Sequence, residues 1–182
     1  MNLNRRKAEL RHQFRATLRA LSCEALAQAS ALICAQLQSW PVFQKVRVMA
    51  LFYPTAVEPN VLSLLRIPDK AFLFPRCHPD KSLTWHPPIG IGQWKRSPSG
   101  IIEPDPMLSP ARSHDNVELV LVPGLAFTPS GVRLGQGGGY YDRFLSQLGP
   151  QIPTAGLCFS CQVHAYLPTE AHDVTIQHVF QA

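Results

Sequence analysis

Apolar side chains recur along the start of the chain at the spacing of one helix face. Their intervals are seven, four, four and three residues. Because each residue turns a helix by about 100°, side chains at these intervals stack on one side. The positions are Leu3, Leu10, Phe14, Leu18 and Leu21. This stripe predicts an amphipathic helix over residues 3–20.

A second helix is predicted directly after the first. Ser22 can cap its N-terminus, and Glu24 places a negative charge in the first turn, where the helix dipole favours one. The apolar positions of this helix are Leu26, Ile33 and Leu37. Trp40-Pro41 is expected to end it, because proline cannot continue a helix.

Five short runs rich in β-branched or aromatic residues have the length of strands. They cover residues 46–53, 71–74, 119–122, 154–159 and 174–179. Pro54 and Pro75 are expected to end the first two runs. The third run, Leu119-Val-Leu-Val122, is entirely aliphatic, which is typical of a strand covered on both faces.

Helical patterns at residues 61–66 and 140–148 lie between these strands. Strands that alternate with helices predict an α/β layered fold. Residues 87–116 are rich in Pro, Gly and Ser and are expected to be irregular. With 182 residues, 46% of them hydrophobic, the chain can bury one sizeable core but is short for two, so we predict a single domain over residues 1–182.

The composition favours a cytoplasmic protein with reduced thiols. The five cysteines are odd in number and irregularly spaced, and no signal-peptide pattern precedes them. Cys158 and Cys161 form a single Cys-x-x-Cys that lacks the second ligand pair of a structural zinc site, so we interpret both as structural rather than as redox or zinc residues. Polar residues or prolines interrupt every hydrophobic run well short of the roughly 18 to 20 residues of a membrane span.

The net charge of +5 and the pI near 9.1 favour acidic partners, such as nucleic acid, an anionic membrane surface or ATP. Six of the seventeen basic residues lie in the first segment, and no aromatic-rich RNA-binding signature accompanies the others. We therefore expect no nucleic acid partner. An Arg-rich start also occurs in transit peptides, but Glu9 and the lack of a serine-rich spacer argue against one.

Residues 120–145 join the buried strand to a glycine-rich loop and a following helix. The loop, Gly135-Gln-Gly-Gly-Gly139, can turn several backbone N–H groups and the positive end of the helix dipole toward one anion, which predicts a phosphate site. No Lys-Ser/Thr follows the glycines as in a Walker A loop, and their spacing does not fit a Rossmann fingerprint. The alternative is a tight left-handed turn without a ligand.

Charged and aromatic residues flank this loop. Arg133, two residues before the first glycine, can supply a cation, and Asp142 offers a carboxylate for Mg²⁺. Tyr140 can stack against a flat ring, whereas Tyr141 is expected to be partly a core residue. The alternative for both tyrosines is a core position only.

Lys7 lies about 40° from Leu3 around the first helix and therefore points toward the body of the protein. Arg11 lies one turn further on, at the edge of the same face. Together they can bring positive charge to a polyphosphate. The alternative for Lys7 is snorkelling, in which the methylene stem covers apolar surface and the ammonium group returns to water.

Two further residues lie beyond predicted strand ends, where α/β proteins bind ligands. Arg76 follows the second strand and Glu58 follows the first. An ordinary surface arginine and an exposed loop acid are the alternatives. Near the end of the chain, Glu170-Ala-His172-Asp173 can supply a second carboxylate to Mg²⁺.

These motifs together resemble the 5-formyltetrahydrofolate cyclo-ligase family. The block Arg133-Leu-Gly-x-Gly-x-Gly-Tyr-Tyr-Asp-Arg143 is the specific part, and the likeness runs in family order from residue 7 to about residue 178. The supporting motifs are Lys7-x-x-x-Arg11, Tyr53, Glu58, Pro75-Arg76, Glu103-Pro104, Val122-Pro-Gly-Leu-Ala-Phe127, Gln162-Val163 and Leu167-Pro-x-Glu-x-His-Asp173.

The resemblance implies a three-layer α/β fold with a mostly parallel central sheet flanked by helices, like that of sugar-phosphate isomerases and CoA transferases. It implies a cytoplasmic enzyme that uses ATP and Mg²⁺ to convert 5-formyltetrahydrofolate to 5,10-methenyltetrahydrofolate, with ADP and phosphate as the other products. The reaction would pass through a phosphorylated formyl group. Reduced folate and ATP would be its partners, and we expect a monomer that binds neither nucleic acid nor a membrane.

The resemblance also implies a role for each site residue. Catalysis would fall to Lys7, Arg133 and Asp142. The residues that would hold ATP are Lys7, Arg11, Arg76, Arg133, Leu134, Gly135, Gln136, Gly137, Gly138, Gly139, Tyr140 and Tyr141. The residues that would hold the folate are Tyr53, Glu58, Gln136, Gly137, Gly138, Gly139 and Tyr140. Asp142 and Asp173 would bind Mg²⁺.

Two positions depart from the family pattern. Gln136 replaces an aromatic or basic residue that many relatives carry, and residues 97–100 lack the aromatic residue that often precedes Glu-Pro. The rival enzyme interpretation is a sugar-phosphate isomerase or CoA transferase, because a phosphate loop alone does not distinguish them. The rival from another class is a basic module that binds nucleic acid or a protein.

Overall fold

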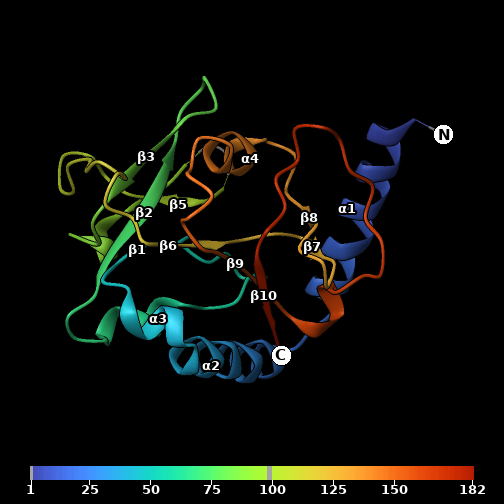
Figure 1. The fold of residues 1–182 in the computed structure, drawn as a ribbon. Helices are drawn as coiled ribbons and strands as arrows, with labels where there is room; N and C mark the ends of the chain where they lie inside the picture. Colours follow the sequence, from blue (N-terminus) through green and yellow to red (C-terminus); the bar gives the residue numbers. More distant parts are fainter. Residues whose placement is uncertain (1, 98–99) are drawn as a thin grey trace.

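A six-stranded sheet runs through the centre of the molecule (Figure 1). The computed structural model describes residues 2–97 and 100–182. The strands lie in the spatial order β10, β9, β6, β1, β2, β3, and all neighbours are parallel except β2 and β3. Their bounds are β1 Val48–Ala50, β2 Ala71–Cys77, β3 Leu83–His86, β6 Leu119–Val122, β9 Thr154–Cys158 and β10 His178–Gln181. The predicted α/β fold with a mostly parallel sheet is confirmed.

Helices cover both faces of this sheet. In Figure 1, α2 and α3 lie below the strands and α4 lies above them. Alternate residues of β6 face the two layers: Leu119 and Leu121 belong to the core on the α2 side, whereas Val120 and Val122 belong to the core on the α4 side. The helix bounds are α1 Leu3–Arg19, α2 Cys23–Ser39, α3 Pro41–Lys45 and α4 Tyr140–Leu145, with 3-10 turns at Leu62–Arg66, Ile91–Gln93 and Ser160–Gln162.

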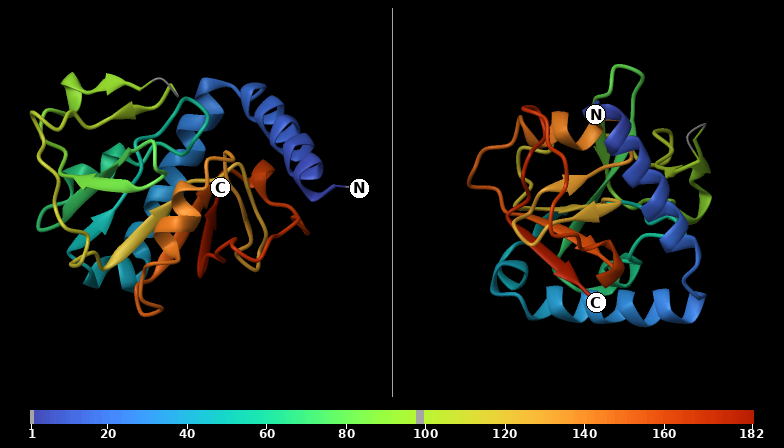
Figure 2. Two further views of the ribbon diagram at one scale, coloured as in Figure 1. Left: turned by 90° about the horizontal axis from the view of Figure 1, so that it is seen from above. Right: turned by 90° about the vertical axis from the view of Figure 1, so that its right-hand side faces the viewer.

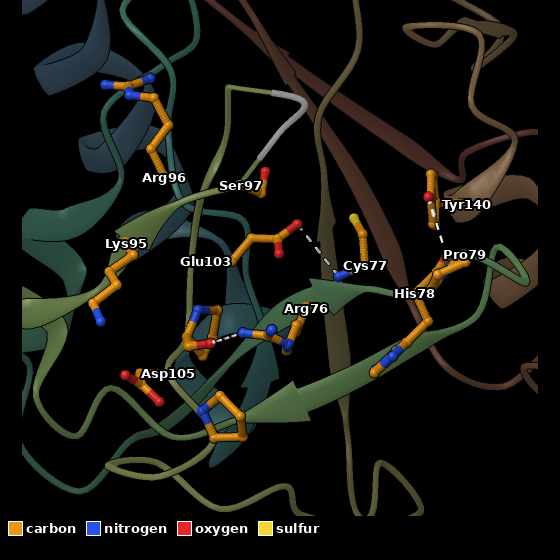
Figure 3. A pocket seen from close by; sticks show the side chains of 12 residues that line it. Arg76, Cys77, His78, Pro79, Lys95, Arg96, Ser97, Glu103, Asp105 and Tyr140 are labelled. Atoms are coloured by element: carbon orange, nitrogen blue, oxygen red, sulfur yellow. Dashed lines mark hydrogen bonds between the residues drawn. The ribbon is translucent and has the colours of Figure 1, made fainter.

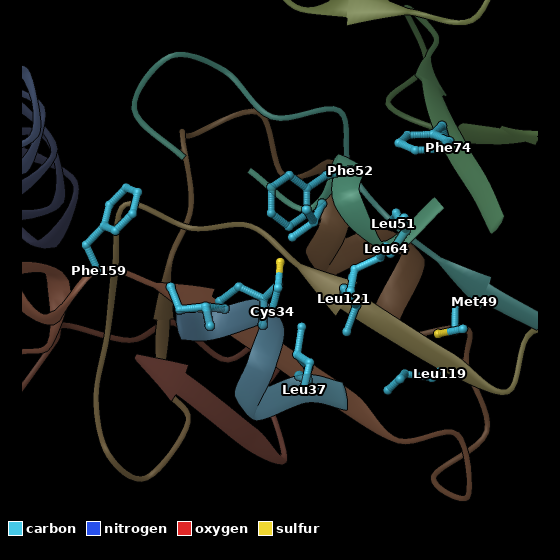
Figure 4. Close-up of a cluster of buried hydrophobic side chains, with 14 of the residues drawn as sticks. Cys34, Leu37, Met49, Leu51, Phe52, Leu64, Phe74, Leu119, Leu121 and Phe159 are labelled. Atoms are coloured by element: carbon cyan, nitrogen blue, oxygen red, sulfur yellow. The ribbon is translucent and has the colours of Figure 1, made fainter. Parts of the chain in front are cut away.

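The larger core fills the space between α2 and the sheet (Figure 4). Leu37 of α2 and Leu121 of β6 are both completely buried there. Full burial of a leucine side chain stabilises a fold by roughly 1.5–3 kcal/mol. This side of the sheet therefore anchors the strands whose carboxyl ends carry the site.

The first two predicted helices are confirmed. Ser22 caps α2, because its hydroxyl accepts a hydrogen bond from the N–H of Ala25 at 3.1 Å. The helix ends at Ser39, and Pro41 then begins the short α3, which the sequence did not predict. Proline is well suited to this place, since the first helical N–H needs no partner.

The prediction that Pro75 ends the second strand is wrong. Pro75 lies inside β2, opposite Trp85 of β3, an antiparallel strand that the sequence pattern did not reveal. Beyond Leu73, β2 has a strand neighbour only on the β3 side. The N–H of Cys77 points to the other side, toward the side chain of Glu103, so the missing N–H of Pro75 also falls on that free edge.

Other boundaries differ by a few residues. The first predicted strand is shorter, and the last begins at His178 because Ile176 instead donates its N–H to the carbonyl of Gly131. The predicted helix at residues 61–66 is a 3-10 turn. Segment 87–116, predicted to be irregular, contains the two-residue strands β4 Lys95–Arg96 and β5 Ile102–Glu103; residues 98 and 99 of that segment lie outside the described residues.

A hairpin of two short strands shapes the chain just before the glycine-rich loop. Its strands, β7 Ala126–Phe127 and β8 Arg133–Leu134, pair antiparallel. Residues 128–131 form the turn, and the hairpin delivers Arg133 to the start of the loop.

Two expectations from composition can be compared with the structure. All five cysteine thiols are free. Cys158 is buried, in agreement with a structural role, whereas Cys161 is exposed, so its structural role stays a prediction. Within the described ranges, no single helix is long and apolar enough to cross a membrane; α1 and α2 meet that test only jointly, with a bend of 104° between them.

Candidate active site

Residues from the two ends of the chain meet at the glycine-rich loop, residues 135–139. The first helix supplies Lys7 and Arg11, and the segment before β10 supplies Glu170 and Asp173. Figure 2 shows α1 beside this C-terminal segment and the β7–β8 hairpin. The site is therefore built where α1 packs against the carboxyl side of the sheet.

Lys7 is buried, with 4% of its surface exposed, and its ammonium group binds two carboxylates. Nζ lies 2.9 Å from Oε2 of Glu170 and 2.5 Å from Oδ2 of Asp173. Burial alone would lower the pKa of Lys7, but the hydrogen bonds with Asp173 and Glu170 outweigh it and raise the pKa. The ammonium group does not return to water, so the snorkelling alternative is wrong.

Asp173 is equally constrained. Burial alone would raise its pKa, but the Lys7 ammonium group and the backbone N–H of Glu170, at 2.8 Å, hold the pKa below its ordinary value. The carboxylate is therefore ionised at neutral pH and available to a cation.

Arg11 and Arg15 bind the glycine-rich loop itself. Nε of Arg11 donates to the carbonyl of Gly135 at 2.9 Å, and the Arg15 guanidinium donates to the side chain and the carbonyl of Gln136. Gly137 has φ 105°, a conformation that side chains rarely adopt, and a Cβ there would lie 3.4 Å from the Arg11 guanidinium carbon. The loop and the cation thus approach closely because no side chain separates them.

Arg133 and Asp142 form a second ion pair on the other side of the loop. Their Nη2 and Oδ1 atoms lie 2.7 Å apart, and the Arg133 side chain is only 4% exposed. The guanidinium group also lies over the ring of Tyr141, 5.9 Å from its centroid. A buried guanidinium group paired in this way is held in one orientation.

Two polar atoms beside this pair have no hydrogen-bond partner among the described residues. They are Nε of Arg133 and the hydroxyl of Tyr141, both buried. Buried donors are almost always satisfied in folded proteins, and exceptions occur at sites where a ligand or water completes the set. Both donors are therefore placed to bind a ligand that is rich in hydrogen-bond acceptors.

Glu58 and Tyr53 lie on the neighbouring side, beyond β1. The carboxyl group of Glu58 accepts the N–H of Thr55 at 2.9 Å, and burial raises its pKa. Burial also raises the pKa of Tyr141, and the nearby Glu58 charge adds to this effect, which places the two groups in one electrostatic neighbourhood. The Tyr53 ring packs 6.0 Å from that of Trp94, between centroids.

Three groups are arranged so that a metal ion can contact them. Ligand atoms of Glu170, His172 and Asp173 all lie within 4.8 Å of one another. Mg²⁺ prefers oxygen ligands and commonly uses one or two carboxylates, so Glu170 and Asp173 fit it better than His172 does. Asp142 is paired with Arg133 rather than with this group, and its predicted role as a metal ligand stays a prediction.

Arg76 and Tyr140 line a separate pocket of about 610 Å³ (Figure 3). It lies between the end of β2, the β4–β5 strand pair and the start of α4. The hydroxyl of Tyr140 donates to the carbonyl of His78 at 3.1 Å, and Arg76 donates to the carbonyl of Pro104 at 2.6 Å. Tyr140 thereby borders both this pocket and the glycine-rich loop.

The structure brings most predicted site residues together, but not all in one cluster. Lys7, Arg11, Arg133 and the loop form one group, and Arg76 lies apart from it in the pocket. Sequence reasoning gave no role to Arg15, although it follows Arg11 by one helical turn on the same face. That spacing was the signal that could have found it.

Gln162 is a further residue whose place only the structure explains. It is completely buried; its amide N–H₂ donates to the carbonyls of Gly124 and Leu125, and its carbonyl accepts the N–H of Phe159. These bonds fix the turn between β6 and the hairpin that carries Arg133. Gln162 is therefore a positioning residue for the site.

A model of the 5-formyltetrahydrofolate cyclo-ligase family matches residues 3–182 of this chain. The chain belongs to this family. A 5-formyltetrahydrofolate cyclo-ligase of Mycolicibacterium smegmatis is 36% identical over 80 residues, which cover 44% of this chain and 41% of that protein. A cyclo-ligase of Haemophilus influenzae is 38% identical over 84 residues, covering 45% and 44%. The chain thus spans less than half the length of these curated relatives.

Solved structures of the family agree over almost the whole chain. The 5,10-methenyltetrahydrofolate synthetase of Aquifex aeolicus is 28% identical, with a TM-score of 0.78, and the match covers 96% of this chain and 89% of that one. The synthetase of Mycoplasma pneumoniae, 22% identical with a TM-score of 0.75, covers 96% and 97% and shows the same fold. The resemblance seen in the motifs is confirmed as family membership.

Proposed function

We propose that this protein closes the ring of 5-formyltetrahydrofolate to give 5,10-methenyltetrahydrofolate, with conversion of ATP to ADP and phosphate. Family membership supports the folate chemistry. The observation that carries the proposal is the presence of buried or loop-bound cations around one glycine-rich loop. Arg11 binds the carbonyl of Gly135, and Arg133 packs against the same glycine. Lys7, one helical turn before Arg11, binds Asp173 beside them. Such a cluster suits the phosphates of a nucleotide.

The first chemical step activates a poor leaving group. The formyl oxygen of the substrate attacks the γ-phosphorus of ATP, the bond from that phosphorus to ADP breaks, and the formyl carbon becomes electrophilic. Phosphoryl transfer asks the protein mainly for positioning and neutralisation of charge. Arg133, held by Asp142, and Lys7 supply fixed positive charge for this purpose.

The second step closes the ring. The nitrogen at position 10 attacks the activated carbon and loses its proton, and the carbon–oxygen bond then breaks, so that phosphate leaves with the former formyl oxygen. Glu58 suits the amino-pyrimidinone part of the pterin, because its carboxyl group lies within the protein and close to Tyr141. Its role is to orient the folate.

Asp173 and Asp142 are the residues that would hold Mg²⁺, which when bound neutralises charge on the phosphates. In the structure described here, each of these carboxylates instead neutralises a cation: Asp173 binds Lys7, and Asp142 binds Arg133. On nucleotide binding, the phosphates would therefore replace Asp173 and Asp142 as the ionic partners of Lys7 and Arg133. This exchange keeps the buried cations compensated before and after binding.

The test is the appearance of methenyltetrahydrofolate absorbance when the protein meets 5-formyltetrahydrofolate, ATP and Mg²⁺. We expect product only when all three are present, with one ADP formed for each ring closed. No product under these conditions would overturn the proposal. An isomerase or CoA transferase would act without ATP, and a basic binding module would turn over no ATP and bind in a strongly salt-dependent manner.

A further inference from the structure

A chain of hydrogen bonds runs through three side chains of the β2–β3 hairpin. Nε2 of His78, in the turn just beyond β2, lies 2.8 Å from the hydroxyl oxygen of Thr84. The same oxygen lies 2.9 Å from Nε2 of His86, and Nδ1 of His86 lies 2.6 Å from the carbonyl oxygen of Ser109. The mechanism of ring closure described above uses none of these groups.

The carbonyl of Ser109 sets the direction of this chain. A carbonyl oxygen can only accept, so Nδ1 of His86 must carry a hydrogen. Burial lowers the pKa of His86 and outweighs the bond to Ser109, which raises it, so the ring is neutral at pH 7. A neutral imidazole has one N–H group, which leaves Nε2 of His86 as an acceptor.

The other two bonds follow from this assignment. Since Nε2 of His86 is an acceptor, the hydroxyl of Thr84 must donate to it. That hydroxyl has then given its only hydrogen, so it accepts from Nε2 of His78, which must carry one. The chain therefore runs from His78 through Thr84 and His86 to Ser109, with one donor and one acceptor in every bond. A hydroxyl that is satisfied on both sides holds both rings in fixed orientations.

The chain ties together segments that lie apart in the sequence. His78 belongs to the hairpin turn, residues 78–82, whereas Thr84 and His86 lie in β3 and Ser109 lies in the loop after β5. His86 is only 2% exposed and Ser109 is completely buried, so the bond between them is shielded from water. The turn is thereby anchored to the body of the protein.

The same turn holds Tyr140. The hydroxyl of Tyr140 donates to the carbonyl of His78 at 3.1 Å, and this carbonyl also accepts the N–H of Lys81. Figure 3 shows the bond from Tyr140 reaching the segment that follows β2. Because the Tyr140 hydroxyl gives its only hydrogen to His78, its oxygen can only accept from a ligand. Tyr140 therefore presents an acceptor at a fixed place beside the glycine-rich loop.

Resting on the proposed function, in which Tyr140 holds the folate, we propose that the chain from His86 through Thr84 to His78 positions Tyr140 for that substrate. The chain fixes the turn, and the turn fixes the hydroxyl of Tyr140. The oxygen of this hydroxyl suits an N–H group of the reduced pterin. His86 and Thr84 are positioning residues, because they act through the carbonyl of His78 and not by contact with the substrate.

The test removes the central hydroxyl of the chain. Thr84→Val keeps the size of the side chain but breaks two of the bonds, whereas Thr84→Ser keeps the hydroxyl. We expect Thr84→Val to raise the KM for 5-formyltetrahydrofolate about three- to tenfold and to leave the KM for ATP near its wild-type value. Thr84→Ser should stay within about twofold of wild type for both. The matched control Thr154→Val removes a hydroxyl that accepts the N–H of Gln177 at the amino end of β9, and it should keep both values.

A double-mutant cycle with Tyr140→Phe distinguishes positioning from a general loss of structure. If Thr84 acts through the hydroxyl of Tyr140, Thr84→Val should have no further effect once that hydroxyl is absent. Full additivity of the two changes, an unchanged KM for the folate in Thr84→Val, or an equal loss in Thr84→Ser would overturn the positioning role and leave ring closure intact. An equal rise in the KM for ATP would overturn it as well, because Tyr140 would then serve the nucleotide.

The tautomers can be measured in the wild-type protein without any substitution. Long-range proton–nitrogen NMR spectra should show His86 with its hydrogen on Nδ1 and His78 with a hydrogen on Nε2. A neutral His86 with its hydrogen on Nε2 would overturn the chain. Failure of the wild-type protein to close the folate ring would overturn the proposed function and this inference together.

Discussion

At the scale of single residues, the site depends on buried cations that are already paired. Arg133 and Lys7 each have about one twentieth of their side-chain surface exposed, and each lies against a carboxylate. Removing one partner from such a pair leaves a buried charge uncompensated, which typically costs about 3–5 kcal/mol. Conservative substitutions are therefore better probes than alanine.

Arg133→Lys keeps the positive charge but loses the planar guanidinium group that binds Asp142. It also removes the buried Nε, which has no hydrogen-bond partner among the described residues. We expect ring closure to slow by about 10²- to 10³-fold, the usual effect of losing one oriented donor to a developing charge. The measurement is the initial rate of product absorbance at saturating ATP. Arg143→Lys, an exposed arginine on the same helix as Asp142, is the control and should stay near the wild-type rate. A rate for Arg133→Lys within tenfold of wild type would remove Arg133 from the catalytic group.

Glu170→Gln removes one of the two carboxylates that bind the Lys7 ammonium group and that, in the proposed mechanism, would compete with the phosphates of ATP. We expect ATP to bind about two- to fivefold more tightly without divalent cations, because less negative charge opposes the phosphates. Calorimetry in the presence of a chelator measures this. The control Glu9→Gln removes an exposed charge on α1 and should leave the affinity for ATP unchanged. Weaker binding by Glu170→Gln would contradict the exchange of ionic partners.

The sequence predicted these residues unevenly. Lys7 was found because its position on the apolar stripe forces it inward, and Arg133 because it flanks the glycines. The role of Glu170 could not be predicted, since 163 residues separate it from the lysine that it binds. Arg76 was predicted near ATP, and only its place in the fold revealed the adjoining pocket.

At the scale of elements, the hairpin before the glycine-rich loop is locked to the segment before β10. Gly131, in the turn between β7 and β8, has φ 87°, and a Cβ there would lie 1.8 Å from the carbonyl oxygen of Ile176. The nearest atoms belong to the backbone of Ile176, which cannot turn aside as the end of a flexible side chain can. The position of Arg133 thus depends on a contact between two distant loops.

Gly131→Ala is expected to destabilise the protein by more than about 2 kcal/mol, because strain at positive φ and a backbone clash add together. Chemical denaturation monitored by circular dichroism measures the loss. Gly92→Ala, in an open position with nothing within 4 Å of the added Cβ, is the control and should remain near wild type. Equal midpoints for the two variants would contradict the contact.

The start of β1 depends on an acidic residue that precedes β6. The carboxylate of Glu118 accepts the N–H groups of Arg47 and Val48, and these bonds hold its pKa below the ordinary value of 4.5. Because its pKa is lower in the folded protein than in the unfolded chain, the ionised carboxylate stabilises the fold at pH values above the pKa of the unfolded chain. This stabilisation is lost as the pH falls through the pKa of the folded protein.

Glu118→Gln should therefore lower the free energy of unfolding by about 1 kcal/mol at pH 7, a modest value because the group is exposed. The difference from wild type should shrink below pH 4.5 and vanish in more acidic solution. Urea titrations across this range measure it. A difference that stays constant with pH would show that charge is not the cause.

Local patterns explain which elements were predictable. The two long helices and β6 follow from periodicity and caps, which depend on neighbours in sequence. β3 and the passage of β2 through Pro75 depend on pairing across the sheet, and the two-residue strands β4 and β5 are too short to leave a pattern. Tertiary pairing decided these elements, and no local signal records it.

At the scale of the whole molecule, both cores share the same central strands. Residues of β1, β6 and β9 alternate between the two clusters, so neither side can lose its packing without exposing the other. This arrangement supports the prediction of a single domain over residues 1–182.

Differential scanning calorimetry should accordingly show one transition whose calorimetric and van't Hoff enthalpies agree. Mg-ATP at about 100 times its dissociation constant should add roughly 2.7 kcal/mol and raise the midpoint by about 5–10 °C. Two separate transitions would contradict the single domain. An unchanged midpoint with Mg-ATP would contradict nucleotide binding.

The bond between Lys7 and Asp173 joins positions 166 residues apart. During synthesis, the helix that bears the lysine emerges long before its acidic partner has been made. A nascent chain can therefore assemble neither ion pair of Lys7 until residues 170–173 have been synthesised. Occupancy by a nucleotide would then report that these two segments, far apart in sequence, have already come together.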